Sequence, residues 1–454
     1  MRLRLLLILL FTPAVLLCAE TPAIVAFIDV NVVPMDQDRV LMHQNVLVRG
    51  GKIDAIGPVD RLTVTEAAQR IDGNGRSWLV PGLADMHTHL STQEDAALYA
   101  AAGVTTVLQM GGESRLEPVL ALRNALAGAL APQIYFGLML DGPQPLAGGW
   151  PVHSVAEARL AVQVAKDRHY DFIKVYNGLG PEEFDAVVAE SRRQGLAVVG
   201  HGVRSVGLPA ALFRGQVMVA HAEEFFYTAF GNKPDETLLA KVVADTARSG
   251  AYVTANLSFL DAIDRQWGKP AVREQFFNDP LVRYMSTVTR VLQWESPRRN
   301  YAVFRGSFPM PMAFMRKFVG ELSRAGVPLL AGTDSPLIPG LIPGAGLNEE
   351  LRTLVEAGLS NYQALSAATR VPGEFVARYV PGATRFGVVQ VGARADLVLV
   401  EENPLAKLGT LRTPLGVMKA GKWWSAADIH AVLEQNRKAM DENIREALRV
   451  GDPR

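Results

Sequence analysis

The sequence has almost no cysteine: Cys18, close to the N-terminus, is the one cysteine among 454 residues. The remainder of the chain therefore contains no disulfide, no cysteine nucleophile and no thiolate ligand for a metal ion. A metal site in this chain would have to be built from histidine, carboxylate or lysine-derived groups.

The sequence also lacks an excess of charge, because 46 basic side chains balance 46 acidic ones. Nucleic acid is not expected as a partner, since phosphate binding needs a basic surface. There is no low-complexity run, heptad array or short repeat, which excludes fibrous, disordered and solenoid proteins. With 49% apolar residues, the chain can bury a sizeable core in one large domain or two ordinary ones.

The N-terminus has the features of an export signal. Arg2 and Arg4 precede the apolar run 5–17, which is shorter than the roughly 20 residues that span a bilayer. We expect residues 1–19 to be a cleaved signal peptide, ending at Ala19, of a periplasmic or secreted protein with no stable membrane span afterwards. An uncleaved anchor is the alternative. A lipoprotein signal ending at Cys18 is disfavoured by Leu17, which stands where a small residue is required.

In the rest of the chain the sequence pattern changes twice, near residue 81 and near residue 382. Residues 24–80 and 383–425 are turn-rich and show short apolar–polar alternation, which is typical of strands. Residues 81–382 alternate short apolar runs with helical stretches rich in alanine, leucine and arginine. Residues 426–454 are expected to form a helical C-terminal tail.

Residues 81–382 contain eight strand-like runs: GLADMHTHL, TTVLQM, QIYFGLML, FIKVY, AVVGH, VMVAH, YVTAN and PLLAGTD. Repeated strand–helix units imply a parallel sheet that is buried on both faces. Eight such units in about 300 residues predict an α/β fold, a (β/α)8 barrel of the TIM type. An open doubly wound sheet is the alternative, but no glycine-rich phosphate loop opens a helix after the first strand.

Polar side chains gather at the ends of these runs, where the active sites of (β/α)8 barrels form. They are His87, His89, Lys174, His201, His221 and Asp334. His87 and His89 are two residues apart, so on a strand both project from one face and can reach one metal ion. Two core histidines would explain that pair alone, but not the histidines that end two further runs.

Lys174 and Asp334 each allow two interpretations. A bare ammonium group in the apolar run FIKVY is costly unless it is paired, so Lys174 belongs either to a buried salt bridge or to a metal centre. Asp334 follows the small residues AGT and could approach a metal-bound water. It could equally cap a helix, because Ser335-Pro336 follows.

Together these features resemble the amidohydrolase superfamily. The resemblance rests on HTH at 87–89, the strand lysine, the two later histidines and GTDS at 332–335. NVLVRGGKIDAIG and GARADLVLVEENP resemble the two halves of that family's small β-sandwich, here residues 24–80 plus 383–425 beside a barrel of residues 81–382. DFIKVYNGLGPEEF, VVGHG and VAHAEEF are similar to the imidazolonepropionase-like group, which includes the Xaa-Pro dipeptidases, or prolidases.

The resemblance implies two divalent metal ions, usually zinc, joined by a lysine that is carboxylated on its amine. His87 and His89 would bind the more buried ion together with Asp334. His201 and His221 would bind the second ion, and carboxylated Lys174 would join the two. Ligands that are all nitrogen and oxygen suit Zn²⁺ without excluding Mn²⁺ or Co²⁺.

The same resemblance gives Asp334 a catalytic role. It would take a proton from a metal-activated water and return it to the leaving amine. Glu223 and Glu224 directly follow His221 and its neighbour. One of them would support a metal ligand, unless both lie in a solvated turn.

The expected substrate-binding residues lie elsewhere. The stretch 257–311 is long for a strand–helix connection and carries the candidates Arg298, Arg299, Tyr301 and Arg305. An arginine there could clasp an α-carboxylate with two hydrogen bonds. Tyr227 is a further candidate, and a helical surface insertion with solvated charges is the alternative.

The predicted function is prolidase-like, metal-dependent hydrolysis of the amide bond of a dipeptide or an N-acyl amino acid. A mononuclear cyclic-amide hydrolase, like imidazolonepropionase, is an alternative against which Lys174 argues. An exported metal-binding protein without activity is a second alternative, against which the complete set of six site residues argues. The sequence leaves a homo-oligomer open, since Trp423-Trp424 fit either a sheet core or a subunit contact.

Overall fold

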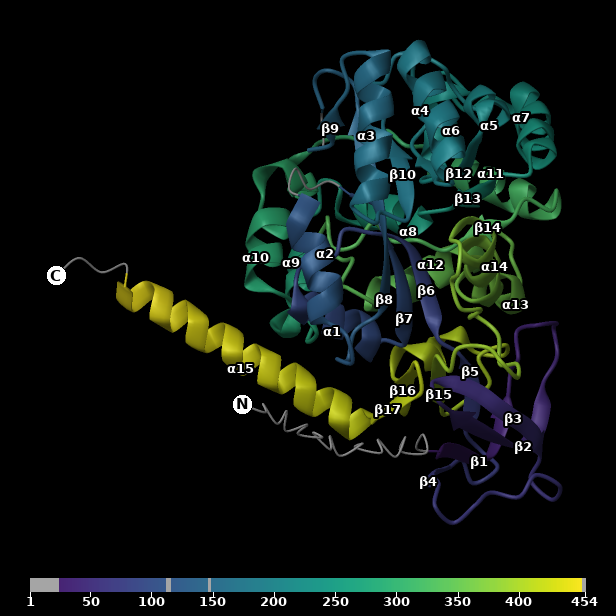
Figure 1. Ribbon diagram of the computed structural model, residues 1–454. Coiled ribbons are helices and arrows are strands. Elements are labelled where there is room, and N and C mark those ends of the chain that lie inside the picture. The colour runs from purple at the N-terminus through teal and green to yellow at the C-terminus, as the bar shows by residue number, and fades with distance from the viewer. Residues whose placement is uncertain (1–23, 112–115, 146–147, 451–454) are drawn as a thin grey trace, which may run out of the picture.

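The computed structural model describes residues 24–111, 116–145 and 148–450. Within them, eight parallel strands lie side by side in the order β14-β13-β12-β11-β10-β8-β7-β6 (Figure 1). They are β6 (Leu83–Thr88), β7 (Val104–Gln109), β8 (Gln133–Asp141), β10 (Phe172–Val175), β11 (Ala197–Gly200), β12 (Gln216–Val219), β13 (Tyr252–Thr254) and β14 (Leu329–Leu330). The short strand β9 (Trp150–Pro151) pairs with β8 at the edge.

Backbone hydrogen bonds close this sheet into a barrel. Met86 N donates to Ala331 O over 2.9 Å, and His89 N donates to Ser335 O over 2.8 Å. These bonds join the first strand, β6, and the residue after it to the segment that directly follows the last strand, β14. The (β/α)8 barrel predicted from the strand–helix alternation is therefore confirmed, and the open doubly wound sheet is not formed.

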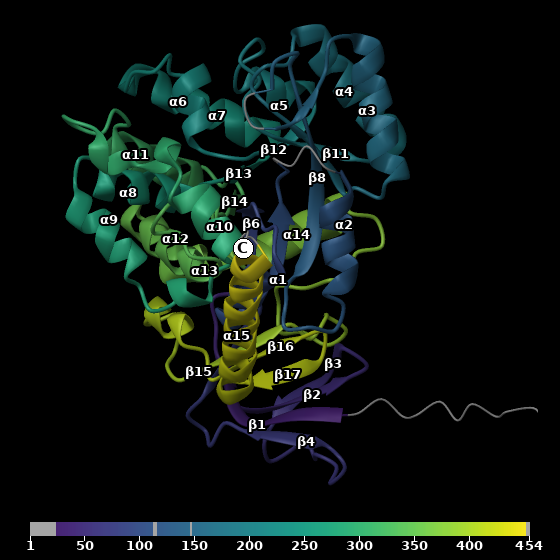
Figure 2. The ribbon, with the colours of Figure 1, turned by 90° about the vertical axis from the view of Figure 1, so that its left-hand side faces the viewer.

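Helices surround the barrel on its outer face (Figures 1 and 2). They are α1 (Gln93–Ala101), α2 (Leu116–Ala125), α3 (Val155–Asp167), α4 (Pro181–Gln194), α5 (Ala210–Arg214), α6 (Glu223–Thr228), α7 (Glu236–Ser249), α11 (Met312–Arg324), α12 (Ala345–Glu356) and α13 (Asn361–Ala367). In α3 the Ser154 side chain caps the first turn by accepting from Glu157 N, and Ala158, Ala161 and Val162 are buried at helical spacing. An apolar stripe of this kind attaches a helix to the sheet.

Apolar side chains fill the bottom of the barrel. Phe172 of β10 and Tyr252 of β13 pack against Phe375, with ring centroids 5.5 and 5.0 Å apart. Phe375 comes from α14 (Arg370–Tyr379). Lys174 lies two residues after Phe172 on the same side of β10, so it is one layer closer to the carboxyl ends of the strands.

A second, mixed sheet is built from both flanks of the chain, in the order β17-β16-β15-β5-β1-β2-β3, with β4 beside β1. Its strands are β1 (Ile24–Val32), β2 (Leu41–Arg49), β3 (Lys52–Pro58), β4 (Gln69–Asp72), β5 (Trp78–Pro81), β15 (Leu397–Val400), β16 (Gly416–Lys419) and β17 (Lys422–Ser425). Trp423 packs edge-on against Phe27, with ring centroids 5.3 Å apart. This contact between N- and C-terminal residues accounts for Trp423 without a subunit contact.

Residues 257–311, which we call the insertion, connect β13 to α11. They form α8 (Leu257–Gln266), α9 (Pro270–Phe277), α10 (Thr287–Thr289) and four single turns, η1 (Val282–Tyr284), η2 (Arg290–Trp294), η3 (Pro297–Arg299) and η4 (Tyr301–Val303). Buried Asp95 of α1 accepts from Ser286 N over 2.9 Å, and buried Trp294 donates from Nε1 to Pro336 O over 3.0 Å. These two bonds fix the middle of the insertion to the barrel.

The C-terminal helix α15 (Ala426–Val450) starts at the mixed sheet and runs past α1 (Figure 1). Ile429 and Leu433 in its first half are buried with Trp424, whereas its far end projects away from the barrel. No helix of the described residues is both long and apolar enough to cross a membrane. The proposed signal peptide, residues 1–19, lies outside the described residues.

Candidate metal centre

A pocket of about 370 Å³ opens at the carboxyl ends of the barrel strands. This volume lies within the range usual for small-molecule sites. The pocket is lined by His89, Ser91, Gln109, Gly111, Met139, Lys174, Tyr176, His201, His221, Glu223, Phe259, Gln293, Arg299, Asp334 and Leu337. Five of the six strand-end residues selected from the sequence line it, and the sixth, His87, is buried directly beneath, in contact with Asp334.

Hydrogen bonds fix the tautomers of His87 and His89. The Nδ1 atom of His87 lies 3.1 Å from Ala220 O, and that of His89 lies 2.7 Å from Gly111 O. A carbonyl oxygen can only accept, so each Nδ1 donates. Burial lowers the pKa of His87 to about 4, so its ring is neutral near pH 7 and Nε2 carries a lone pair.

Asp334 Oδ1 lies opposite the Nε2 atoms of both rings, 3.2 Å from that of His87 and 2.8 Å from that of His89. Neither His87 Nε2 nor Asp334 Oδ1 has a hydrogen-bond partner. Two acceptor atoms that face each other in a buried site require a cation or a proton between them. The neutral ring of His87 leaves a cation as the better complement.

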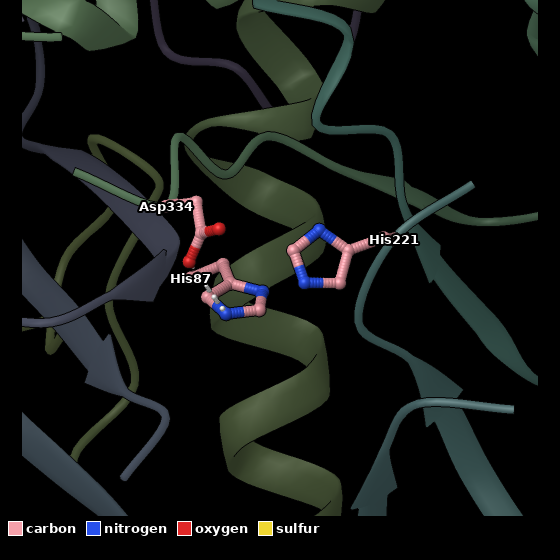
Figure 3. A group of neighbouring side chains, drawn as sticks. All are labelled: His87, His221 and Asp334. Carbon is pink, nitrogen blue, oxygen red and sulfur yellow. Dashed lines mark ion pairs between the residues drawn. The ribbon is translucent and has the colours of Figure 1, made fainter. Parts of the chain in front are cut away.

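His221 completes a group suited to a metal ion. One ligand atom each from His87, His221 and Asp334 lie within 4.8 Å of one another, and Figure 3 shows the three side chains converging. Burial holds the pKa of His221 well below its usual value, and its Nδ1 atom has no partner. The orphaned nitrogen and oxygen atoms therefore fit a divalent ion held by histidine and carboxylate.

Glu224 supports His201, the fourth histidine. Its Oε1 atom lies 2.9 Å from His201 Nδ1, and its Oε2 atom accepts from Gly202 N over 3.2 Å. A carboxylate in this position sets the orientation of the ring and leaves Nε2 as the nitrogen that can bind a metal ion. The His201 ring lies 4.7 Å from that of His221, centroid to centroid. Of the two glutamates after His221, Glu224 is thus the one in contact with a proposed ligand.

Lys174 is buried in β10, where Asp334 and Glu224 influence its charge from beyond ion-pair distance. Among the described residues no carboxylate lies within ion-pair distance of its Nζ atom, which is 5.6 Å from the centroid of the Tyr176 ring. Burial lowers the pKa of Lys174 to about 8, so a large part of the amine is neutral near that pH. The buried salt bridge that the sequence allowed for this lysine is not formed within the described part of the chain.

The backbone at Asp334 is unusual. Its φ of 60° lies in the left-handed region, and its N donates to His87 O over 2.8 Å. Such strain is often found at functional sites. The helix-cap interpretation of Asp334 does not hold, since the next helix, α12, begins only at Ala345.

Asp85 is a supporting residue that the sequence analysis missed. It is fully buried and accepts from His87 N over 3.2 Å, from Thr333 N over 3.0 Å and from Thr333 Oγ1 over 2.6 Å. It thereby joins the segment before His87 to the segment before Asp334. Burial raises its pKa to about 8. An acid two residues before His87 in the apolar run GLADMHTHL was the available signal.

Glycine is required at two of the strand ends. A Cβ atom on Gly332 would lie 2.9 Å from the Cβ of His87 and 2.4 Å from Thr254 Cγ2. A Cβ atom on Gly200, which has a φ of 129°, would lie 2.2 Å from Val175 O. These close approaches bring the backbones next to His87 and His201 near enough for their side chains to meet.

Of the residues predicted to bind the substrate, only Arg299 lines the pocket. Arg299 lines the pocket, and no carboxylate among the described residues pairs with it. Its Nη1 atom lies 3.5 Å from the hydroxyl of Tyr301, which does not line the pocket. Arg298 and Arg305 are exposed, and Tyr227 is half-buried on α6 outside the pocket lining. Gln293, also from the insertion, lines the pocket and had no sequence signal.

Comparison with known proteins agrees with the fold. No family model and no curated protein sequence matches this chain. Among solved structures, the chain is similar to a bottromycin amidohydrolase, at 22% identity and a TM-score of 0.71, over 93% of this chain and 91% of that one. It is also similar to a putative prolidase from Bifidobacterium longum, at 22% identity and a TM-score of 0.63, over 92% of this chain and 99% of that one.

A third similar structure is a Xaa-Pro dipeptidase with bound methionine in the active site, at 18% identity and a TM-score of 0.65, over 89% of this chain and 100% of that one. The chain therefore has the fold of these amidohydrolases. The resemblance inferred from HTH, the strand lysine and GTDS is confirmed at the level of the fold.

Proposed function

We propose that this protein is a metal-dependent hydrolase that cleaves the amide bond of a small substrate, a dipeptide or an N-acyl amino acid. The observation that carries the proposal is the set of orphaned ligand atoms at the carboxyl ends of the strands. His87, His221 and Asp334 bring such atoms together beneath a pocket of suitable size. The similarity to amidohydrolases and prolidases supports the same reaction class.

The ligand assignment follows the order of the strands. His87, His89 and Asp334 would hold one divalent ion. His201 and His221 would hold a second, and Lys174 would join the two as its carbamate, which forms from a neutral amine and carbon dioxide. The absence of a carboxylate partner for Lys174 among the described residues supports this assignment, because carboxylation replaces an unpaired buried cation with an anionic ligand.

Divalent ions at such a site supply an activated water and polarise the substrate carbonyl. Asp334 would accept the proton of the attacking water on its carboxylate and donate it to the leaving nitrogen. Arg299, at the wall of the pocket, would bind the carboxylate that follows the scissile bond. Glu224 and Asp85 would keep His201 and His87 in position through the contacts described above.

A mononuclear cyclic-amide hydrolase is the second candidate. One observation favours it: a single ion would satisfy the close group of His87, His221 and Asp334. The two candidates differ in metal content, with about two ions per chain expected for the first and one for the second.

Export to the periplasm or the medium remains part of the proposal. It rests on residues 1–19 of the sequence alone.

The test is hydrolysis of a dipeptide panel by the protein loaded with Zn²⁺, Mn²⁺ or Co²⁺, with metal analysis of the same samples. We expect cleavage of at least one dipeptide, loss of activity on chelation, and about two ions per chain. Cleavage of lactams alone, with one ion per chain, would favour the second candidate. No cleavage of any amide by fully loaded protein would exclude both.

A further inference from the structure

Glu223 faces the same pocket as the proposed metal ligands but forms no hydrogen bond or ion pair with them. Its side chain is only 8% exposed, it lines the pocket, and its Oε2 atom has no hydrogen-bond partner. It is not part of the close group formed by His87, His221 and Asp334. Glu224, its neighbour, is already engaged with His201 and Gly202. Glu223 is therefore available to a ligand.

The surroundings of Glu223 indicate the charge of that ligand. Three acidic side chains lie near enough to influence it: Glu224, Asp334 and Glu350. Among the described residues, no lysine or arginine lies within ion-pair distance of it. A buried carboxyl group without a counter-charge is costly, and a cationic group on a ligand would offset that cost.

Arg299 gives the same pocket a second, opposite charge. It lines the pocket together with Tyr176, which lies two residues after Lys174. Its positive charge is near enough to Tyr176 to oppose the rise in pKa that burial causes there. A free dipeptide carries both complementary charges, an ammonium group before the scissile bond and a carboxylate after it. The pocket volume of about 370 Å³ lies within the range usual for small ligands.

We propose that Glu223 binds the free α-ammonium group of the substrate, so that the enzyme prefers unblocked dipeptides to N-acyl amino acids. The proposal rests on the amide hydrolysis proposed above and narrows its substrate class. Glu223 lies two residues after the proposed ligand His221, and an α-ammonium group lies one carbon away from the scissile carbonyl. The carboxylate of the substrate would instead meet Arg299, a basic side chain that lines the same pocket.

The test compares matched ligands on full-length, metal-loaded protein and on its Glu223→Gln variant. Leucinol carries the ammonium group without a carboxylate, and N-acetylleucine carries the carboxylate without an ammonium group. Calorimetry should show leucinol binding weakened at least about tenfold by Glu223→Gln, the loss expected for a hydrogen bond to a charged group. N-acetylleucine binding should stay within about twofold, and metal content should not change.

Kinetics give the second readout. For leucyl-leucine, Glu223→Gln should raise KM by at least about tenfold, whereas for N-formyl-leucyl-leucine the parent and variant should be alike. Glu182→Gln, an exposed change on α4, serves as the neutral control. Glu224→Gln serves as the matched buried control and should lower metal content without changing the preference between the two substrates.

Equal losses for leucinol and N-acetylleucine, or an unchanged KM for leucyl-leucine, would overturn the proposal. A parent enzyme that cleaves N-acyl amino acids and no free dipeptide would also overturn it, while leaving amide hydrolysis intact. Failure of the proposed function itself has a different signature, because no amide of either class would then be cleaved by the loaded protein.

Discussion

The floor and the wall of the pocket are built in different ways. The floor consists of strand ends, where His87, His89 and Asp334 are fixed by backbone hydrogen bonds within the closed barrel. The wall includes the insertion, which presents Gln293 and Arg299 on single helical turns held to the barrel by Asp95 and Trp294. This difference suggests that the floor carries the chemistry and the wall carries the choice of substrate. It predicts that changes in the floor lower kcat and that changes in the wall raise KM.

The largest effect is expected from the floor, at Lys174. Lys174→Ala should remove bound metal and activity together, because its carbamate would join the two proposed ions. The affinity for metal and the rate of dipeptide hydrolysis should both fall more than about 100-fold, which exceeds the usual effect of replacing a residue that only supports a ligand. Short carboxylic acids such as acetate should restore part of both.

The control for this prediction is Lys166→Ala, an exposed change on α3 that should behave like the parent. Full activity of Lys174→Ala would contradict the binuclear assignment.

The next effect is expected at Asp334. Asp334→Asn should lose two to four orders of magnitude in kcat, roughly the range for general acid–base groups, because an amide cannot accept the proton. KM should change little, since the residue does not bind the substrate in this account. Steady-state kinetics measures kcat and KM, and the melting temperature shows whether the variant is folded. A stable variant with kcat within about tenfold of the parent would remove the catalytic role.

The positions of the floor residues could be predicted from the sequence because of the barrel's regularity. The carboxyl ends of all the strands lie on one face of the barrel. A histidine or lysine at the end of an apolar run is therefore expected on that face. Lys174, His201 and His221 were located in this way, without knowledge of their partners. Asp85 was missed because its role depends on Thr333, 248 positions away in the chain, and no local pattern reports such a contact.

The wall could be predicted as a region but not residue by residue. The length of the connection after β13 indicated an insertion at the pocket. However, the pattern of residues 298–305 contains three arginines, and only the fold shows that Arg299 lines the pocket while Arg298 and Arg305 are exposed. Irregular turns have no period from which the direction of a side chain can be deduced.

Glu350 joins α12 to the first helix of the insertion, α8, and should make the stability pH-dependent. It is buried on α12 and accepts from Ser258 N of α8 over 2.7 Å, and burial raises its pKa from 4.5 to about 7. Because the folded pKa lies above the unfolded one, its contribution is fully present below about pH 4.5 and is lost as the pH rises through 7. The loss is about 3 kcal/mol.

Unfolding in urea at pH 5 and pH 8 measures this effect. Glu350→Gln should reduce the difference in unfolding free energy between the two pH values, whereas the exposed change Glu182→Gln should leave it as in the parent. An unchanged difference in Glu350→Gln would mean that this carboxyl group does not titrate as its burial indicates.

The smallest effect is expected in the wall. Arg299→Met should raise KM for a free dipeptide by about tenfold with little change in kcat, since it removes a charge-assisted hydrogen bond to the substrate carboxylate. The amidated dipeptide should show no such penalty. Arg298→Met should have the smaller effect of the two, because Arg298 is exposed outside the pocket lining, and Lys269→Met controls for the loss of a charge in the insertion. Equal penalties for the free and amidated dipeptides would refute the carboxylate contact.

The central claim is that the strand-end residues form a metal centre that hydrolyses amides. The most direct measurement is the rate of dipeptide hydrolysis by the full chain as metal is removed with a chelator and then returned while bound metal is counted. The account predicts that activity falls to the background with the metal and returns in proportion to the ions bound, reaching its maximum at about two per chain. Hydrolysis that persists in metal-free protein, or a fully loaded protein that cleaves no amide, would contradict it.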